Sequence, residues 1–253
     1  MDLNLTGKNA LVCAASRGLG RACAEALARE GCDVTITGRD RAALEATAEA
    51  IASTTGRRVL FAEGDISTAA GRSAALAVCP GPDILINNAG GPPGADFRKL
   101  TEAQWLQALQ SNMLAAIAMI GLCVEGMTSR GFGRVVNITS MAEVRPSPEN
   151  PLSSASRAGL ASFVRAIAPQ VARHNVTVNN LLPGPFDTAR LASFPERLQF
   201  FRNGPAGRVG TPFEFGEACA FLCGAHAGFI TGQSLLMDGG FSIAGSATPQ
   251  QQT

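Results

Sequence analysis

Residues 13 to 20 decide the fold, and they read Cys13-Ala14-Ala15-Ser16-Arg17-Gly18-Leu19-Gly20. They follow a short apolar run, residues 9–14, that is typical of a buried parallel strand, and they open a helical pattern over residues 18–30. A glycine-rich turn between a strand and a helix presents backbone N–H groups and the positive end of the helix to a phosphate. The stretch therefore predicts a dinucleotide-binding unit, although a glycine-rich turn with no ligand has the same sequence pattern.

The alternation of short apolar runs with longer Ala/Leu-rich segments continues along all 253 residues. It predicts parallel strands joined by crossover helices. The predicted strands are 9–14, 33–37, 58–62, 83–86, 133–139, 176–182 and 234–237, and the predicted helices are 18–30, 41–53, 102–130, 152–173 and 213–223. Pro169 is expected to kink or loosen the helix that contains it. We therefore expect an α/β fold: a Rossmann-type doubly wound parallel sheet of about seven strands with helices on both faces.

One domain is expected over residues 1–244, because the chain is too short for two ordinary domains, and the small polar residues 245–253 predict a disordered tail. Between Pro183 and Thr211 the sequence shows neither a clean strand nor a long helix, which predicts a functional insertion such as a lid. Either an apolar substrate with an anionic group, or a helix that packs its apolar side onto the domain, would explain the aromatic and basic residues there. These residues are Phe186, Phe194, Leu198, Phe200, Phe201, Arg190, Arg197 and Arg202.

The composition limits the classes of molecule that the protein is expected to bind. The formal net charge is +1 and the basic residues are spread along the chain, so neither nucleic acid nor a membrane surface is expected to bind. Residues 1–8 lack the pattern of a signal peptide, and no segment is expected to reach the roughly 18 apolar residues of a membrane span, so we expect a cytoplasmic protein. The seven cysteines form no C-x-x-C pair and are expected to be reduced core thiols, with no metal site.

Two arginines indicate which dinucleotide is bound. The second strand runs into Thr37-Gly38-Arg39, where an NAD-preferring site usually has an acidic residue for the ribose hydroxyls. Arg39 and Arg17 together offer two guanidinium groups, whose geometry suits a 2′-phosphate. The pattern favours NADP(H) over NAD(H), although a solvated surface charge is the commoner role of either arginine taken alone.

From about Leu5 to Phe241 the sequence resembles the short-chain dehydrogenase/reductase family, and within it the 3-oxoacyl-acyl-carrier-protein reductase type. The matching motifs are Asn87-Asn88-Ala89-Gly90, Asp65-Ile66 beside the adenine, Pro183-Gly184 with Thr188 beside the nicotinamide, and the C-terminal Thr231-Gly232-Gln233 and Asp238-Gly239-Gly240. The C-terminal signature usually lies at a subunit interface, so the resemblance implies a homotetramer or homodimer. Ala14 departs from the family, which has a glycine there. The cofactor-binding residues that the resemblance implies are Ala14, Ser16, Arg17, Gly18, Leu19, Gly20, Arg39, Asp65, Ile66, Asn88, Ala89, Gly90, Arg157, Pro183, Gly184 and Thr188.

The resemblance also implies four catalytic positions, Asn112, Ser140, Ser153 and Arg157. In the family an asparagine supports a water chain, a serine orients the substrate oxygen, a tyrosine exchanges the proton and a lysine holds the ribose. Asn112 and Ser140 match, but Ser153 stands at the tyrosine position and Arg157 at the lysine position, and the chain contains no tyrosine. An aliphatic hydroxyl is a far poorer acid than a phenol, so Ser153 is expected to act through a water, while Arg157 can still donate to the ribose.

Glu143 and Glu149 are candidate replacement acids, because desolvation can raise the pKa of a glutamate, although both are also typical of solvent-facing loops. Three functions remain open. The first is an NADP(H)-dependent oxidoreductase acting on the carbonyl or alcohol of a small molecule with an atypical proton donor. The second is a catalytically silent NADP(H)-binding protein. The third is a cofactor-free lyase resembling the halohydrin dehalogenases, against which stands the retained glycine-rich turn.

Overall fold

Seven parallel strands form the centre of the computed structural model, which describes residues 2–244. The strands are β1 (Asn9–Val12), β2 (Asp33–Gly38), β3 (Val59–Glu63), β4 (Ile84–Asn87), β5 (Gly133–Ile138), β6 (Val176–Pro183) and β7 (Ser234–Met237). They pair in the order β3-β2-β1-β4-β5-β6-β7, so the order reverses between β1 and β4. The expected doubly wound parallel sheet is confirmed, whereas the predicted tail, residues 245–253, lies outside the described residues.

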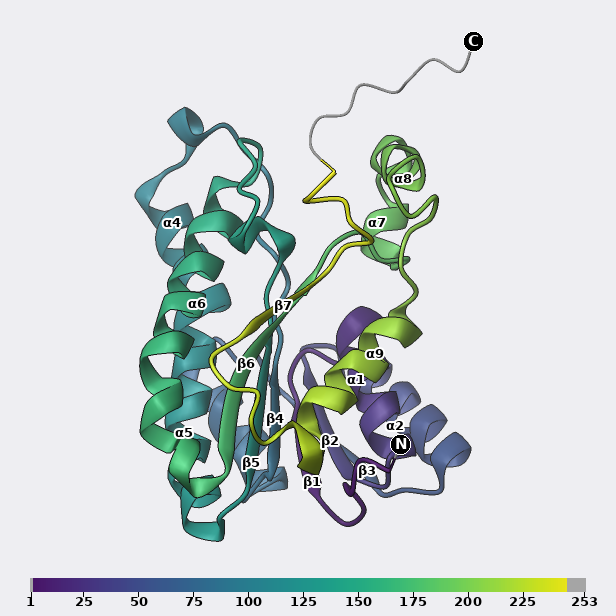
Figure 1. Ribbon diagram of the computed structural model, residues 1–253, viewed down its shortest axis with the longest axis vertical. Coiled ribbons are helices and arrows are strands. Elements are labelled where there is room, and N and C mark those ends of the chain that lie inside the picture. Colours follow the sequence, from purple (N-terminus) through teal and green to yellow (C-terminus); the bar gives the residue numbers. More distant parts are fainter. Residues whose placement is uncertain (1, 245–253) are drawn as a thin grey trace.

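Helices cover both faces of this sheet (Figure 1). One face carries α1 (Gly18–Arg29), α2 (Arg41–Thr55) and α9 (Pro212–Cys223), and the other carries α4 (Glu102–Leu109), α5 (Ala115–Arg130) and α6 (Pro151–Val171). The sequence pattern missed α3 (Ala69–Val78), which packs on β2 and β3. Thr68 caps α3 by accepting a hydrogen bond from the N–H of Gly71, and a Cβ at Gly71 would lie 2.0 Å from the Asp65 oxygen. The small residues that permit this close approach also weaken the apolar periodicity by which a helix is recognised.

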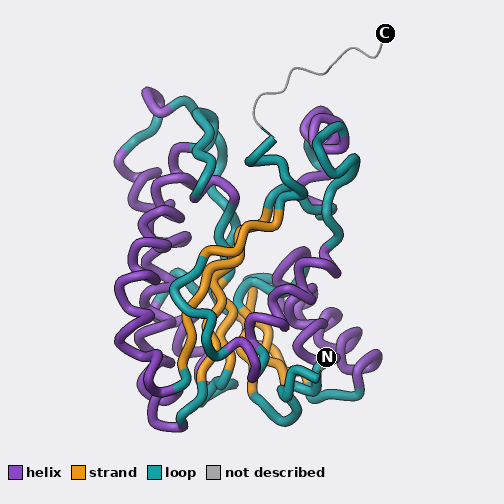
Figure 2. The backbone as a smooth tube through the Cα atoms, viewed as in Figure 1, coloured by secondary structure: helices purple, strands orange, loops and turns teal. Residues whose placement is uncertain are grey.

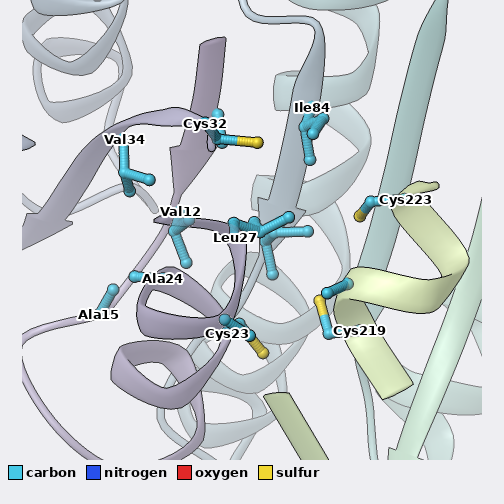
Figure 3. Packing of buried hydrophobic residues seen from close by; sticks show 14 of the residues in the cluster. Val12, Ala15, Cys23, Ala24, Leu27, Cys32, Val34, Ile84, Cys219 and Cys223 are labelled. Carbon is cyan, nitrogen blue, oxygen red and sulfur yellow. The ribbon is translucent and has the colours of Figure 1, made fainter. Parts of the chain in front are cut away.

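The core between α1, α9 and the sheet is built from small aliphatic side chains and thiols (Figure 3). Cys23 and Leu27 from α1 face Cys219 and Cys223 from α9, beside Val12 of β1. All seven cysteines are buried and free, and burial raises the pKa of the Cys223 thiol. The prediction of core thiols is therefore confirmed.

The long helix predicted over residues 102–130 forms α4 and α5, joined by a π-helical turn at Gln110–Leu114. Among the described residues this 29-residue run is the one helix long and apolar enough to cross a membrane, with a mean hydropathy of 1.5 over an 18-residue window. Its longest uninterrupted apolar run is residues 113–124, shorter than the roughly 18 apolar residues of a membrane span, so the expectation is not contradicted. In the structure Met119, Ile120 and Met127 on this helix are buried, so its inner side belongs to the core of the fold.

The segment between β6 and α9 contains two short helices, α7 (Ala189–Ala192) and α8 (Pro195–Arg202), which lie beyond the carboxyl end of β6 (Figure 2). No residue of α8 is buried, and the Phe200 side chain is 62% exposed. Leu198 and Phe201 of α8 are half-buried, and the Phe201 ring meets that of Phe241 edge-on at 5.1 Å, so the alternative that a helix here packs its apolar side onto the domain is borne out in part. Phe186 belongs to the core instead, where its ring meets that of Phe215 edge-on at 5.1 Å.

One strand and one helix end earlier in the structure than the sequence predicts. The first strand stops at Val12 and not at Ala14, because Ala14 has a φ of +47°, which no strand residue adopts. The helix that contains Pro169 ends at Val171, and a 3₁₀ turn follows at Ala172–His174. The α-helix continues past Pro169, so the kink or loosening expected there stays a prediction.

Candidate functional site

The glycine-rich turn lies at the carboxyl end of β1, where the order of the sheet reverses. Gly18 has a φ of +62°, and a Cβ at Gly20 would lie 2.6 Å from the Ala14 oxygen and 2.8 Å from Asn88 Nδ2. Asn88 Nδ2 donates to that same Ala14 oxygen at 3.1 Å, which ties the turn to the loop after β4. The crevice at such a reversal point is where open α/β sheets bind ligands.

Ala14 is held in a left-handed conformation by its neighbours. With Asn4 and Asn175 it is one of three non-glycine residues of positive φ in the described chain. Its N–H donates to Thr37 Oγ1 at 3.3 Å, and the N–H of Ala15 donates to the Thr37 oxygen at 2.9 Å. The turn therefore accommodates alanine at the expected glycine position, with a strained backbone.

The N-terminus of α1 offers its N–H groups to the crevice. Arg17 is the N-cap residue, it forms no side-chain capping hydrogen bond, and the first turn of α1 contains no acidic residue. By contrast, Asp40 caps the next helix by accepting from the N–H of Ala43 at 3.1 Å. An uncapped helix N-terminus with an adjacent guanidinium suits an anion.

Arg39 lies at the end of β2 with 80% of its side chain exposed, and its Nη1 is 3.9 Å from the Asp65 carboxylate. Hydrogen bonds from the Ser67 hydroxyl and N–H lower the pKa of Asp65, and the Arg39 charge lowers it further. Asp65 and Arg39 therefore form an exposed, loose ion pair beside the crevice, and the guanidinium of Arg39 can still turn toward a phosphate.

The other end of the crevice is formed where β6 ends. The N–H of Gly184 donates to the Met237 oxygen at 2.9 Å, and a Cβ at Gly184 would lie 2.5 Å from Asp238 Cβ, so the position after Pro183 accepts only glycine. The Thr188 side chain caps α7 by accepting from the Leu191 N–H at 3.4 Å. The predicted residues Pro183, Gly184 and Thr188 thus lie between the sheet and α7.

Arg157 projects from α6 toward β5 and the π-helical turn, and only 6% of the residue is exposed. Its Nη1 donates to the Ile138 oxygen at 2.8 Å and its Nη2 to Asn112 Oδ1 at 3.0 Å, while Nε finds no acceptor among the described residues. Burial, and after it the nearby charge of Arg190, lowers the pKa of Arg157 to about 10 against the opposing effect of Glu143. The guanidinium thus braces Asn112, and only its remaining hydrogens can serve a ribose.

A cavity of about 20 Å³, the space of roughly one water, lies beside Arg157. Among the residues that line it are five of the predicted site residues, Ile66, Asn88, Ala89, Asn112 and Arg157. These five come from four separate segments of the chain, so the fold brings them together.

Ser140 and Ser153 are both partly exposed and do not line that cavity. The Ser140 hydroxyl accepts from the Ala142 N–H at 3.2 Å and so caps the 3₁₀ turn Met141–Glu143. Ser153 lies in the first turn of α6, and no hydrogen bond joins the two serine side chains in the described structure. Each hydroxyl therefore remains available for a ligand or a water.

The two candidate acids differ. Glu149 is exposed, and its hydrogen bond with the Ser147 hydroxyl lowers its pKa, so the prediction that it serves as an acid with a raised pKa is wrong. Glu143 is half-buried and accepts from Thr139 Oγ1 at 3.0 Å and from Ser234 Oγ at 2.5 Å. Both carboxylate oxygens of Glu143 are therefore already engaged by hydroxyl donors.

The sequence reasoning missed a buried chain of side chains that crosses four strands. Asn87 donates to Asn137 at 2.9 Å, Asn137 donates to Asn180 at 3.0 Å, and Asn180 donates to Ser234 at 3.3 Å, which in turn donates to Glu143. The strand partners are in register, and each asparagine is at most 5% exposed. Asparagines at matching positions in apolar strand runs were the available signal, because a buried amide needs a partner.

The chain is similar to known proteins over most of its length. Residues 13–242 match the family model described as enoyl-(acyl carrier protein) reductase. The chain is 32% identical over 244 residues to the 3-oxoacyl-(acyl-carrier-protein) reductase of Chlamydia trachomatis serovar D, covering 94% of this chain and 98% of that protein. The chain belongs to the short-chain dehydrogenase/reductase family. The expected family, a family of oxidoreductases, is therefore confirmed.

Two solved structures of reductases extend the comparison. The L-sorbose reductase of Gluconobacter frateurii, complexed with NADPH and L-sorbose, has a TM-score of 0.89 and 27% identity, covering 95% of this chain and 98% of that one. A 3-oxoacyl-(acyl-carrier-protein) reductase of Agrobacterium tumefaciens with NADP bound has a TM-score of 0.87 and 31% identity, covering 94% and 95%. Both structures share the fold of this short-chain dehydrogenase/reductase.

Proposed function

We propose that the protein is an NADP(H)-dependent oxidoreductase that transfers hydride between the nicotinamide and the carbonyl or alcohol carbon of a small molecule. The observation that carries the proposal is the uncapped N-terminus of α1 with Arg17 beside it and Arg39 nearby at the end of β2. Structures similar to this chain contain NADPH or NADP, which supports the choice of cofactor.

The residues of the crevice suit the parts of that dinucleotide. The N–H groups of residues 18–20 would hold the pyrophosphate, and Arg17 and Arg39 would hold the 2′-phosphate. On the family resemblance Asp65 and Ile66 would hold the adenine, residues 88–90 the ribose side, and Thr188 the nicotinamide. When bound, the nicotinamide accepts or supplies the hydride, and the protein supplies position and electrostatics.

The proton chemistry rests on Ser140, Ser153 and solvent. Ser140 orients the substrate oxygen, and a water held by Ser153 gives a proton to that oxygen as hydride reaches the carbon; the reverse direction returns the proton to water. Arg157 contributes a fixed positive charge and holds Asn112 in place. Positioning alone supplies much of the rate of such a transfer, so the reaction does not require the phenol that the chain lacks.

A second candidate function is a catalytically silent NADP(H)-binding protein. The absence of tyrosine from the chain and the use of Arg157 as an internal brace favour it. Both candidates require the same cofactor crevice, and turnover separates them.

The decisive experiment restores the family's acid. Ser153→Tyr with Arg157→Lys is compared with the parent for NADPH oxidation over a carbonyl panel, and Ser153→Phe with Arg157→Lys is the matched control that adds the ring without the hydroxyl. The tyrosine variant is expected to gain about 10²-fold over the phenylalanine variant. A parent with no turnover and a tyrosine variant that gains it would establish the silent binder. If calorimetry detects no NADPH binding to the parent, both candidates are wrong.

We further propose a cytoplasmic homo-oligomer, a homotetramer or homodimer. Support comes from the outer side of the long helix, where Leu106, Leu114 and Leu122 are 59%, 45% and 57% exposed. Large apolar side chains that stay exposed along one helix suit contact with a second copy. Light scattering of the parent is expected to give a dimer or tetramer, and Leu122→Glu is expected to lower its mass. A monomeric parent would contradict the assembly.

A further inference from the structure

We propose that Arg190 is a specificity-determining residue and that it binds a carboxylate of the substrate, so that the substrate class is a small oxo acid or the corresponding hydroxy acid. The inference rests on the proposed oxidoreductase function and specifies its substrate. It concerns a residue of α7 that faces the loop following the N-N-A-G motif across the crevice.

Arg190 bridges the two sides of the crevice through weak contacts. Its Nη1 donates to the Gly91 oxygen at 3.2 Å and its Nη2 to the Pro92 oxygen at 3.4 Å. Hydrogen bonds from a guanidinium to a well-matched charged acceptor are about 2.7–2.9 Å long. The fork of Arg190 is therefore held at the crevice but poorly satisfied there, and a carboxylate can displace both carbonyls.

The positive charge at this place is not balanced by an ion pair. Within the described residues neither Arg190 nor Arg157 lies within 4.0 Å of a carboxylate oxygen, whereas Arg208 in the same segment is paired with Glu214 at 2.6 Å. Arg190 and Arg157 are also close enough to repel each other, since the charge of Arg190 disfavours that of Arg157. A carboxylate placed beside Arg190 would relieve this repulsion and gain a bidentate contact.

The surroundings of Arg190 suit a small acid. Thr188, two residues before Arg190, provides a hydroxyl group at the start of α7. Glu143 is committed to Thr139 and Ser234, and so does not neutralise Arg190 by direct contact. An anion that brings its own carbonyl group is thus the ligand that the charge of Arg190 and the proposed hydride transfer together favour.

Binding is tested with matched acid and ester pairs that differ only in charge, acetoacetate with methyl acetoacetate and levulinate with methyl levulinate. Each is titrated by calorimetry into the NADP⁺-loaded protein, in which no carbonyl can be reduced. The variants are Arg190→Gln and Arg190→Lys, and Arg202→Gln on α8 is the control for loss of one exposed positive charge near the site. The Kd of NADP⁺ is measured for every variant.

Arg190→Gln is expected to weaken binding of the acids by about 10- to 100-fold and to leave the esters unchanged, with Arg190→Lys in between and Arg202→Gln like the parent. Equal binding of acid and ester to the parent, or no binding of either, overturns the proposal. An equal loss for acid and ester shows that Arg190 only holds the loop in place. A weaker Kd for NADP⁺ with unchanged acid selectivity shows that its anion is a cofactor phosphate, which also overturns the proposal.

The same measurements distinguish failure of the oxidoreductase function from failure of the role of Arg190. Acid-selective binding that depends on Arg190, combined with no NADPH oxidation by any substrate, leaves the substrate class standing and removes the oxidoreductase. Turnover of esters and acids at equal kcat/KM, unaffected by Arg190→Gln, keeps the oxidoreductase and removes the role of Arg190.

Discussion

Replacement of Ala14 by glycine is expected to stabilise the protein. Ala14 has a φ of +47°, and an L-residue with a Cβ in that region loses about 1–2 kcal/mol relative to ordinary backbone. Glycine removes that penalty but makes the unfolded chain more flexible, which offsets about 0.4–1 kcal/mol of the gain. The net expectation for Ala14→Gly is a gain of about 0.5–1 kcal/mol in the free energy of unfolding, or a rise in Tm of about 1–4 °C for a chain of this size.

The conformation is fixed from outside the residue, so the strain cannot relax easily. The Ala14 N–H and oxygen are held by Thr37 and Asn88, and its neighbours Cys13 and Ala15 donate to the oxygens of Ile86 and Thr37. Movement of Ala14 to negative φ would break some of these contacts, each worth about 1 kcal/mol.

The assay is urea and thermal unfolding at one protein concentration, because an oligomer has a concentration-dependent Tm. Ala46→Gly on the exposed side of α2 is the matched control; it is expected to lose about 1 kcal/mol, as glycine does in an ordinary helix. Ala14→Asn is expected to fall between Ala and Gly, since asparagine tolerates the left-handed region. If Ala14→Gly loses stability as Ala46→Gly does, the backbone at Ala14 is not strained and the reasoning is refuted.

Two further perturbations test the site and the segment that leads into α9. Asn137→Ala removes the centre of the amide chain and leaves Asn87 and Asn180 without their partner, so it is expected to lose about 2–4 kcal/mol by urea unfolding, and an unchanged midpoint would show that the chain is not a stabilising unit. Glu214 has a pKa lowered to about 2, first by its hydrogen bond with Arg208, and so contributes stability above its ordinary pKa of 4.5 that is lost as pH falls toward 2. Because both side chains are well exposed, Glu214→Ala is expected to cost only about 1 kcal/mol at pH 7, and the difference from the parent should vanish near pH 2; a difference that grows in acid would contradict the assignment.

The sheet and the crevice could be predicted from the sequence because they depend on local patterns. Apolar runs with flanking glycines predict buried strands and turns, and the structure has each of these strands within one or two residues of the predicted ends. The helix α3 escaped detection because Gly71 and its small neighbours replace the large apolar residues by which a helix is recognised. Its close packing against Asp65 is a tertiary property and leaves no periodic trace.

The finer geometry of the site could not be predicted because it depends on residues far apart in the chain. Arg157 was expected to face a ribose, but the length of its side chain lets it reach the Ile138 oxygen and Asn112 in the interior of the fold. The asparagine chain likewise depends on the register of four strands, which follows from the sheet order and not from any one segment. Arg190 acquires its significance only from its position opposite Gly91 and near Arg157.

On the proposed assignment, Ser153 and Arg157 form a consistent pair. The positive charge of a lysine at this position would lower the pKa of a neighbouring phenol. The same charge has no comparable effect on an aliphatic hydroxyl, because that group does not ionise near neutral pH. A guanidinium can instead donate along two directions at once, and Arg157 does so toward Ile138 and Asn112, which an ammonium on a shorter, single-headed side chain cannot reproduce. The loss of the phenol thus removes the reason for a lysine, and the arginine converts the cation into a rigid support for the site.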